Sequence, residues 1–155
     1  MFLVKKDTYH SLTILLSNIQ THYIEDQPGL QQNIVKLSKV VKRVDLPLHN
    51  HLMDQGMMYQ QLCFRWFHNF LLRETSIKNI IRIWDTYLSC SGFGSFHVYV
   101  CAAILVQDSE KIRGMPLEEI FQYIQQMHYD DDVNILLSQA YVLSTLFDGN
   151  EAHLG

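Results

Sequence analysis

The chain has 155 residues, of which 48% are hydrophobic and 18% are charged, and its formal net charge is −4 at pH 7. A chain of this length can form one globular domain with a sizeable core. It has no basic block, which disfavours a nucleic-acid surface and a polybasic membrane patch. The longest wholly apolar run, Val98 to Val106, is far shorter than the ~20 residues that span a bilayer. These features indicate a single soluble domain.

The cysteines and histidines do not indicate a metal centre. Cys63, Cys90 and Cys101 are widely spaced and form no C-x-x-C pair, which predicts reduced and mostly buried thiols. His49 and His51 in LPLHNHLMDQ could begin a metal site, because imidazole is a common metal ligand. No cysteine or carboxylate cluster completes a ligand spacing, so we interpret them as loop histidines without metal. We expect no cofactor.

Apolar residues at helical spacing predict two helices before Pro47. Asp7 is a plausible N-cap of the first helix, which ends near Tyr23, where EDQPG breaks the pattern. Pro28 suits the first turn of the second helix. The apolar positions are Leu12, Leu15, Leu16 and Ile19 in the first helix and Leu30, Ile34, Leu37, Val40, Val41 and Val44 in the second, whose opposite, solvated face carries Lys36, Lys39 and Lys42.

The middle of the chain predicts the core. A short helical segment after Pro47 leads through Gly56 into MMYQQLCFRWFHNFLL, which is apolar on nearly all sides and predicts a buried central helix. Ser76 is expected to cap the next helix. Beyond the loop SCSGFGS, residues Phe96 to Val106 are apolar all round and predict a second core helix. The inner stripe expected after Ser76 consists of Ile77, Ile80, Ile81, Trp84 and Leu88.

The last third of the chain predicts two more helices. Pro116 with Glu118 and Glu119 marks a helix start, because acidic side chains favour the positive end of the helix dipole. Its expected inner face is Ile120, Phe121 and Ile124, and DDDV caps a last helix through Phe147. Since no segment alternates with a period of two, we predict an all-α fold, an irregular helical array in one domain.

Three segments together carry a family resemblance. The series FRWFHNFLLRE, IRIWDTYLS and FHVYVCAAILV, in that order and separation, resembles the C-terminal half of the TBC domain, the all-helical module of GTPase-activating proteins for Rab GTPases. NIQTHYIEDQPGLQQNIVKLSKVVKRVD and DDDVNILLSQAYVLSTLF are similar to the flanking segments, especially those of the Golgi-type subfamily. The resemblance covers residues 7 to 147 and is specific, because several aromatic and charged positions agree at once.

The resemblance implies a domain organisation and a partner. Residues 1–147 would form the C-terminal part of a TBC domain, and residues 148–155 a polar, frayed tail. The partner would be a Rab-type small GTPase in vesicle trafficking. The location would be cytoplasmic, including the periphery of Golgi or other trafficking membranes. An unpaired half domain would also bind the N-terminal TBC half or self-associate.

Members of this family use an arginine from an I-x-x-D-x-x-R motif and a glutamine from a Y-x-Q motif, both N-terminal to the matched segments. This sequence contains no I-x-x-D-x-x-R. Y-x-Q occurs at Tyr59-Gln60-Gln61 and at Tyr123-Ile124-Gln125, which we interpret as chance matches. We therefore expect a chain that begins after the catalytic residues and is not an enzyme by itself. The alternative is a non-catalytic adaptor or scaffold built on the same array.

Five of the charged residues between Phe64 and Tyr87 have two interpretations. The favoured one pairs them within the fold, with Arg82 and Asp85 on one helix face, because buried charges need partners. In the other, some of them line the groove that receives the GTPase. The residues are Arg65, Arg73, Glu74, Arg82 and Asp85. The candidate partner-binding residues are Arg65, Arg73, Met57, Met58 and Tyr59, although core packing is the simpler role for the last three.

Other enzymatic readings are weak. Gly92-Phe93-Gly94 is too short for a phosphate-binding loop and follows no strand. Cys63 and His68 could form a nucleophile pair only if their side chains met, and a separation of five residues on one helix does not aim them together.

Overall fold

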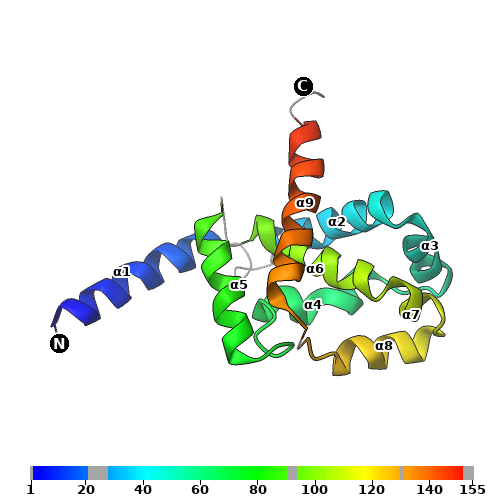
Figure 1. Cartoon of the computed structure of the whole chain (residues 1–155), viewed down its shortest axis with the longest axis horizontal. Helices are drawn as coiled ribbons and strands as arrows, with labels where there is room; N and C mark the ends of the chain where they lie inside the picture. Colours follow the sequence, from blue (N-terminus) through cyan, green and yellow to red (C-terminus); the bar gives the residue numbers. More distant parts are fainter. Residues whose placement is uncertain (1, 21–27, 91–93, 130, 152–155) are drawn as a thin grey trace.

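The computed structural model describes residues 2–20, 28–90, 94–129 and 131–151 (Figure 1). Within these ranges it contains nine helices and no strand, apart from an isolated bridge between Thr75 and Tyr129. The predicted all-α array is confirmed. The helices are α1 (Phe2–Ile19), α2 (Pro28–Val44), α3 (Leu46–Asp54), α4 (Tyr59–Asn69), α5 (Ile77–Ser89), α6 (Ser95–Gln107), α7 (Ser109–Arg113), α8 (Leu117–Gln126) and α9 (Val133–Glu151).

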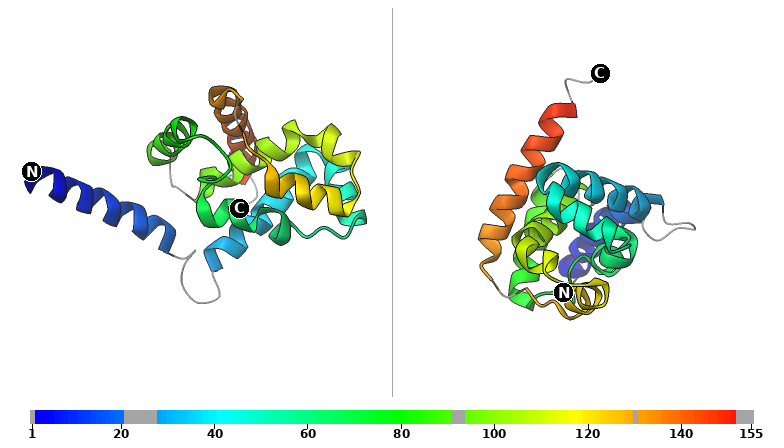
Figure 2. Two further views of the ribbon diagram at one scale, coloured as in Figure 1. Left: turned by 90° about the horizontal axis from the view of Figure 1, so that it is seen from below. Right: turned by 90° about the vertical axis from the view of Figure 1, so that its right-hand side faces the viewer.

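Helix α6 is the centre of the core. Every residue from Phe96 to Leu105 is buried, as its apolar sequence predicted. Its most extensive contacts are with α9 and α2, which lie on different sides of it (Figure 2). Ala102 and Ala103 are fully or almost fully buried there, and their small side chains permit close approach of the neighbouring helices.

Helix α2 begins at Pro28 as predicted and buries one face. Leu30, Leu37 and Val40 are fully buried, whereas Val44 at the end of the helix is exposed. Lys36 is half-buried, and its ammonium lies 4.8 Å from the centroid of the Tyr99 ring. The predicted lysine face is therefore solvated at Lys39 and Lys42 but packed at Lys36.

Helix α4 is shorter and more amphipathic than predicted. It ends at Asn69, because Phe70 and Leu71 both adopt left-handed backbone conformations, with φ of 48° and 63°. Leu62, Cys63, Trp66 and Phe67 are buried, while Gln60, Gln61 and Phe64 are exposed. The expectation of a helix buried on nearly all sides was wrong.

The inner face predicted for α5 was also largely wrong. Ser76 caps the helix as expected, accepting a hydrogen bond from the Asn79 amide at 3.4 Å. The buried residues are Ile80, Ile83 and Tyr87. Four of the five residues of the predicted stripe lie outside the core: Ile77, Ile81 and Leu88 are exposed and Trp84 is half-buried. The helix packs through its other apolar face, in contact with α9.

Several boundaries differ from the predictions. Helix α1 begins at Phe2, so Asp7 lies inside it and is not its N-cap, and the expected end near Tyr23 lies outside the described residues. His49 and His51 lie in α3, not in a loop. The sequence did not predict α7.

At the C-terminal end, α8 starts after Pro116 as predicted and buries Ile120 and Ile124, but Phe121 is 42% exposed. Helix α9 continues past Phe147 to Glu151, and residues 152–155 of the predicted tail lie outside the described ranges. No described helix is both long and apolar enough to cross a membrane.

Candidate functional site

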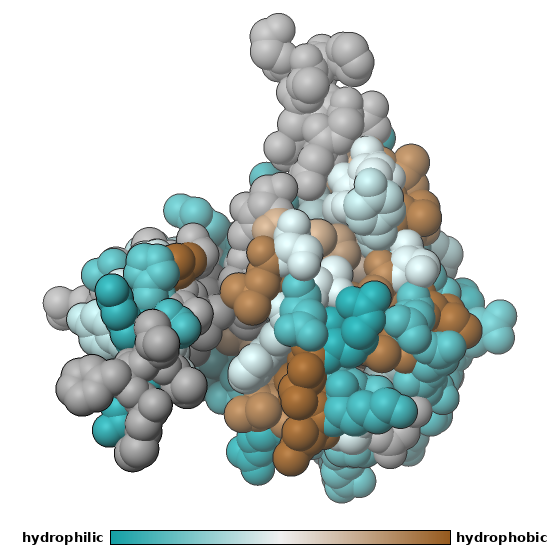
Figure 3. Space-filling model, turned by 60° about the vertical axis from the view of Figure 1, so that its left-hand side comes forward, coloured by the Kyte–Doolittle hydropathy of each residue, from teal (hydrophilic) through white to brown (hydrophobic). Residues whose placement is uncertain are grey.

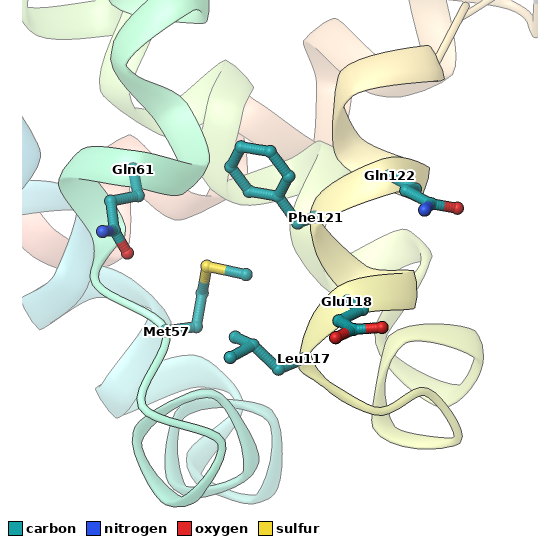
Figure 4. A pocket seen from close by; sticks show the side chains of 6 residues that line it. All are labelled: Met57, Gln61, Leu117, Glu118, Phe121 and Gln122. Carbon is teal, nitrogen blue, oxygen red and sulfur yellow. The ribbon is translucent and has the colours of Figure 1, made fainter.

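An open groove of about 340 Å³ lies between α8 and the start of α4 (Figure 4). Met57 and Leu117 point toward each other across it, and Phe121 reaches from α8 toward α4. Glu118 and Gln122 point away from the gap, which gives the α8 wall an apolar inside and a polar outer rim. The lining residues are Met57, Gln61, Leu117, Glu118, Phe121 and Gln122.

Local sequence features build both walls of this groove. Gly56 turns the chain out of α3 with a φ of 73°, a backbone conformation that favours glycine, and so delivers Met57 to the groove floor. Pro116 then starts α8. The Gln55 side chain accepts a hydrogen bond from the Leu117 amide at 3.0 Å, which ties the end of α3 to the start of α8. This hydrogen bond joins the chain just before Met57 to the wall that carries Leu117.

The groove has a buried floor and exposed apolar walls. Met57 is 2% exposed, whereas Leu117 and Phe121 are 40% and 42% exposed. Met58, next to the floor residue in sequence, is 58% exposed. Exposed apolar side chains gathered around a concavity with a polar rim are typical of a surface that binds a protein partner.

Arg65 links α4 to the end of α8. Its Nε donates to Glu74 Oε1 at 2.5 Å, and its Nη2 donates to the backbone oxygen of Gln125 at 2.9 Å. Glu74 is only 1% exposed, and its Oε2 has no hydrogen-bond partner among the described residues. The interpretation that pairs these charges within the fold therefore accounts for Arg65 and Glu74, because a buried carboxylate requires a cation beside it.

The other charged residues behave differently. Arg82 Nη1 donates to Thr86 Oγ1 at 2.7 Å, so the predicted pair with Asp85 was wrong. Arg73 is exposed and forms no hydrogen bond or ion pair with the described residues. The Arg73 guanidinium could therefore bind a partner without breaking a contact within the described residues.

The five candidate contact residues divide into two groups. Met57 and Tyr59 are buried, so packing accounts for them, and the Tyr59 hydroxyl lies 3.1 Å from His49 Nδ1. Burial raises the pKa of Tyr59. Met58 and Arg73 are exposed, and Arg65 is partly exposed. A contact role for these residues stays a prediction.

Other sequence candidates have structural explanations. His51 Nε2 lies 3.0 Å from the Met115 carbonyl, and no group of three or more His, Cys, Asp or Glu in the described ranges is placed to hold a metal. Cys63 is fully buried, which raises the pKa of its thiol, and His68 stacks on Phe64 instead. A buried thiol of raised pKa is not an activated nucleophile.

The sequence did not predict the groove. Gln61, from one Y-x-Q match, lines it, but Leu117 was not singled out and Phe121 was assigned to the core. The sequence offered no signal for the exposure of Phe121, because the apolar face of a surface helix is wide enough to bury adjacent residues, as α2 does with Val40 and Val41.

The structure is thus an all-α helical array with an apolar groove at its surface. Residues 1–113 match the model of the Rab-GTPase-TBC domain family, and the chain belongs to this family. The GTPase-activating protein gyp1 of Schizosaccharomyces pombe is 41% identical over 97% of the chain, and human TBC1 domain family member 22A is 39% identical over 93%. A solved structure, the Ypt/Rab-GAP domain of Gyp1p, superposes with a TM-score of 0.84 over 91% of the chain at 37% identity.

The match is partial on the side of the relatives. The chain spans 30% of the S. pombe protein, 29% of the human protein and 45% of the solved Gyp1p chain. The family and fold that the sequence motifs implied are confirmed.

Proposed function

We propose that this chain is the Rab-binding part of a GTPase-activating domain, and that the α4–α8 groove receives an apolar side chain of the GTPase. The single observation that carries this proposal is the groove itself, with Met57 at its floor and Leu117 and Phe121 exposed on its wall. Membership of the Rab-GTPase-TBC family supports a Rab-type GTPase as the occupant.

The chain would dock the GTPase and leave the chemistry to residues that it lacks. Acceleration of GTP hydrolysis needs a cation against the phosphoryl oxygens and a group that orients the attacking water. The family supplies them from I-x-x-D-x-x-R and Y-x-Q motifs, and the first is absent from this sequence. Stimulation would therefore require joining to a segment that carries both motifs.

Binding tests the role of the groove. A panel of Rab GTPases, loaded with GDP or a non-hydrolysable GTP analogue, is titrated with the chain. Phe121→Ala should weaken binding by about tenfold, because a partly exposed aromatic at a contact loses roughly 1 to 2 kcal/mol of burial. Ile135→Ala, at a 54% exposed position on α9, is the control and should leave affinity unchanged. Equal affinities for all three proteins would contradict the groove assignment.

Hydrolysis tests the division of labour. In single-turnover assays the chain alone should not accelerate GTP hydrolysis, since an arginine finger contributes about 10³ to 10⁵ in rate. Gln61→Ala and Gln125→Ala should leave that result unchanged. Stimulation of about a hundredfold by the purified chain would show that it holds a finger of its own.

The absence of I-x-x-D-x-x-R also favours the second candidate, a non-catalytic adaptor or scaffold. A fusion discriminates the two. Placing the finger-bearing segment of the S. pombe relative before this chain should restore stimulation if the chain retains the geometry of a GTPase-activating domain. A fusion that binds the GTPase without stimulating it would favour the adaptor.

A further inference from the structure

Helix α5 carries an apolar stripe that the fold leaves exposed except at Trp84, which also packs against the core. Ile77, Ile81 and Leu88 are 76%, 55% and 59% exposed, and Trp84 between them is half-buried. We name these four residues the α5 seam. On the face shown in Figure 3, which carries α5, hydrophobic residues form an exposed band. The seam runs almost the whole length of the helix, from its first residue to its last but one.

The spacing of the seam is that of a coiled-coil contact. Its residues are separated by four, three and four positions, the repeat by which two helices interlock along a shared seam. This spacing reads the same in both directions. An antiparallel second α5 would therefore place Ile77 opposite Leu88 of the second copy and Ile81 opposite Trp84 of the second copy. The seam is complementary to itself.

The charges beside the seam fit the same arrangement. Lys78 follows Ile77 and Asp85 follows Trp84, so both charged side chains flank the seam on the same side of the helix. In an antiparallel pair Lys78 lies beside Asp85 of the second copy, and the contact occurs twice because of the symmetry. Opposite charges at these flanking positions select partner and orientation in paired helices.

We propose that two copies of this chain associate through their α5 seams, antiparallel about a two-fold axis that passes between residues 82 and 83. A two-fold contact needs one self-complementary surface, and cyclic dimers are the commonest homo-oligomers. Palindromic spacing and paired charges favour a second copy over another occupant.

Sedimentation of the full chain over a wide concentration range tests the association. The wild type should shift from monomer to dimer as concentration rises. Ile81→Glu should raise the dimer dissociation constant by tenfold or more, about the effect of burying two unpaired carboxylates. Ile135→Glu, at a 54% exposed position on α9, is the matched control and should dimerise like the wild type. Circular dichroism checks that both variants remain helical.

Charge exchange tests the antiparallel orientation. Lys78→Asp places two carboxylates together and Asp85→Lys places two ammonium groups together, so each variant should weaken dimerisation. The double variant Lys78→Asp/Asp85→Lys restores both pairs and should recover most of the loss. Lys78→Asp falls in the first turn of α5, where the helix dipole favours an acidic side chain.

Three outcomes would overturn the proposal. The first is a wild type that stays monomeric at every concentration. If Ile81→Glu then weakens GTPase binding, the α5 seam faces a different protein. The second is association that Ile135→Glu disrupts as strongly as Ile81→Glu. The third is a double charge variant that dimerises no better than the single ones.

Discussion

The buried carboxylate of Glu74 needs a nearby cation, and Arg65 provides it. One of its oxygens binds Arg65, and the other has no hydrogen-bond partner among the described residues. Arg65 is 29% exposed, so water reaches the cation but hardly the anion. Removing the cation would leave a desolvated charge behind, which costs more than the ion pair contributes.

Arg65→Met should lower the free energy of unfolding by about 2 kcal/mol, below the 3 to 5 kcal/mol typical of a fully buried pair because Arg65 is partly solvated. Chemical denaturation measures the change. Arg65→Met/Glu74→Gln should regain part of it, since no buried charge remains. Arg73→Met, at an exposed arginine, should change stability by less than about 0.5 kcal/mol. Equal losses in the two single variants would contradict the role given to Glu74.

His49 should make the fold sensitive to mild acid. Burial, and secondarily Lys42, lower its pKa below the ordinary 6.5. At a pH below 6.5 the unfolded chain therefore takes up the proton more readily than the folded chain, and stability falls as the pH drops from 6.5 to the folded-state pKa. His49→Gln should flatten this dependence in thermal melts. His10→Gln on α1 is the control, and an equal flattening there would contradict the assignment.

The corner between α4 and α5 shows how elements hold one another in place. Phe70 and Leu71 adopt left-handed conformations that cost about 1 kcal/mol each for residues other than glycine. Trp84 Nε1 donates to the Phe70 oxygen at 3.1 Å. His97 Nε2 lies 3.0 Å from the Trp66 oxygen, which can only accept, so the Tyr87 hydroxyl donates to His97 Nδ1 at 2.7 Å. Side chains from α5 and α6 thus fix the end of α4.

Two substitutions at Trp84 separate its hydrogen bond from its packing. Trp84→Phe removes the bond to Phe70 and should cost about 1 kcal/mol of unfolding free energy. Trp84→Ala also removes the ring and should cost about 3 kcal/mol. Denaturation midpoints of the two variants test this. Unchanged midpoints together with lost GTPase binding would identify Trp84 as a contact residue instead of a structural one.

The whole molecule has a stable centre and a weakly attached N-terminal helix. Helix α6 contacts both α2 and α9 extensively, whereas α1 shares no extensive contact with another described helix and extends away from the rest (Figures 1 and 2). An isolated helix of this length is marginal in water, because its stability comes mainly from packing.

Amide hydrogen exchange should therefore be slowest in α6 and fastest in α1. Amides of α6 should exchange only through global unfolding, and amides of α1 should exchange fastest among the helices, through local opening. Mass spectrometry of the exchanging chain resolves the two segments. Equal protection of α1 and α6 would show that α1 is packed in solution. If the protection of α1 then rises with chain concentration, a second copy provides that packing.

The sequence by itself determined most of the helices and the family. Pro28, Ser76 and Pro116 mark helix starts through local backbone chemistry, and α6 is apolar on every side, so any packing buries it. The motifs of the TBC family were legible for a similar reason, since they consist of residue types at fixed separations. None of these predictions needed knowledge of distant contacts.

Only the tertiary structure decided which faces are buried and where the groove lies. Helix α5 is apolar on two neighbouring faces. The predicted stripe included Ile80, which is buried, but it also included Ile77 and Ile81, which are exposed, and it left out Ile83, which is buried. Periodicity is local and fits both faces equally. The groove pairs Met57 with Phe121, far apart in the chain, and their separation depends on how α3, α4 and α8 pack. Which face of a helix is buried depends on the neighbouring helices, because their packing removes water from one face and not from the other.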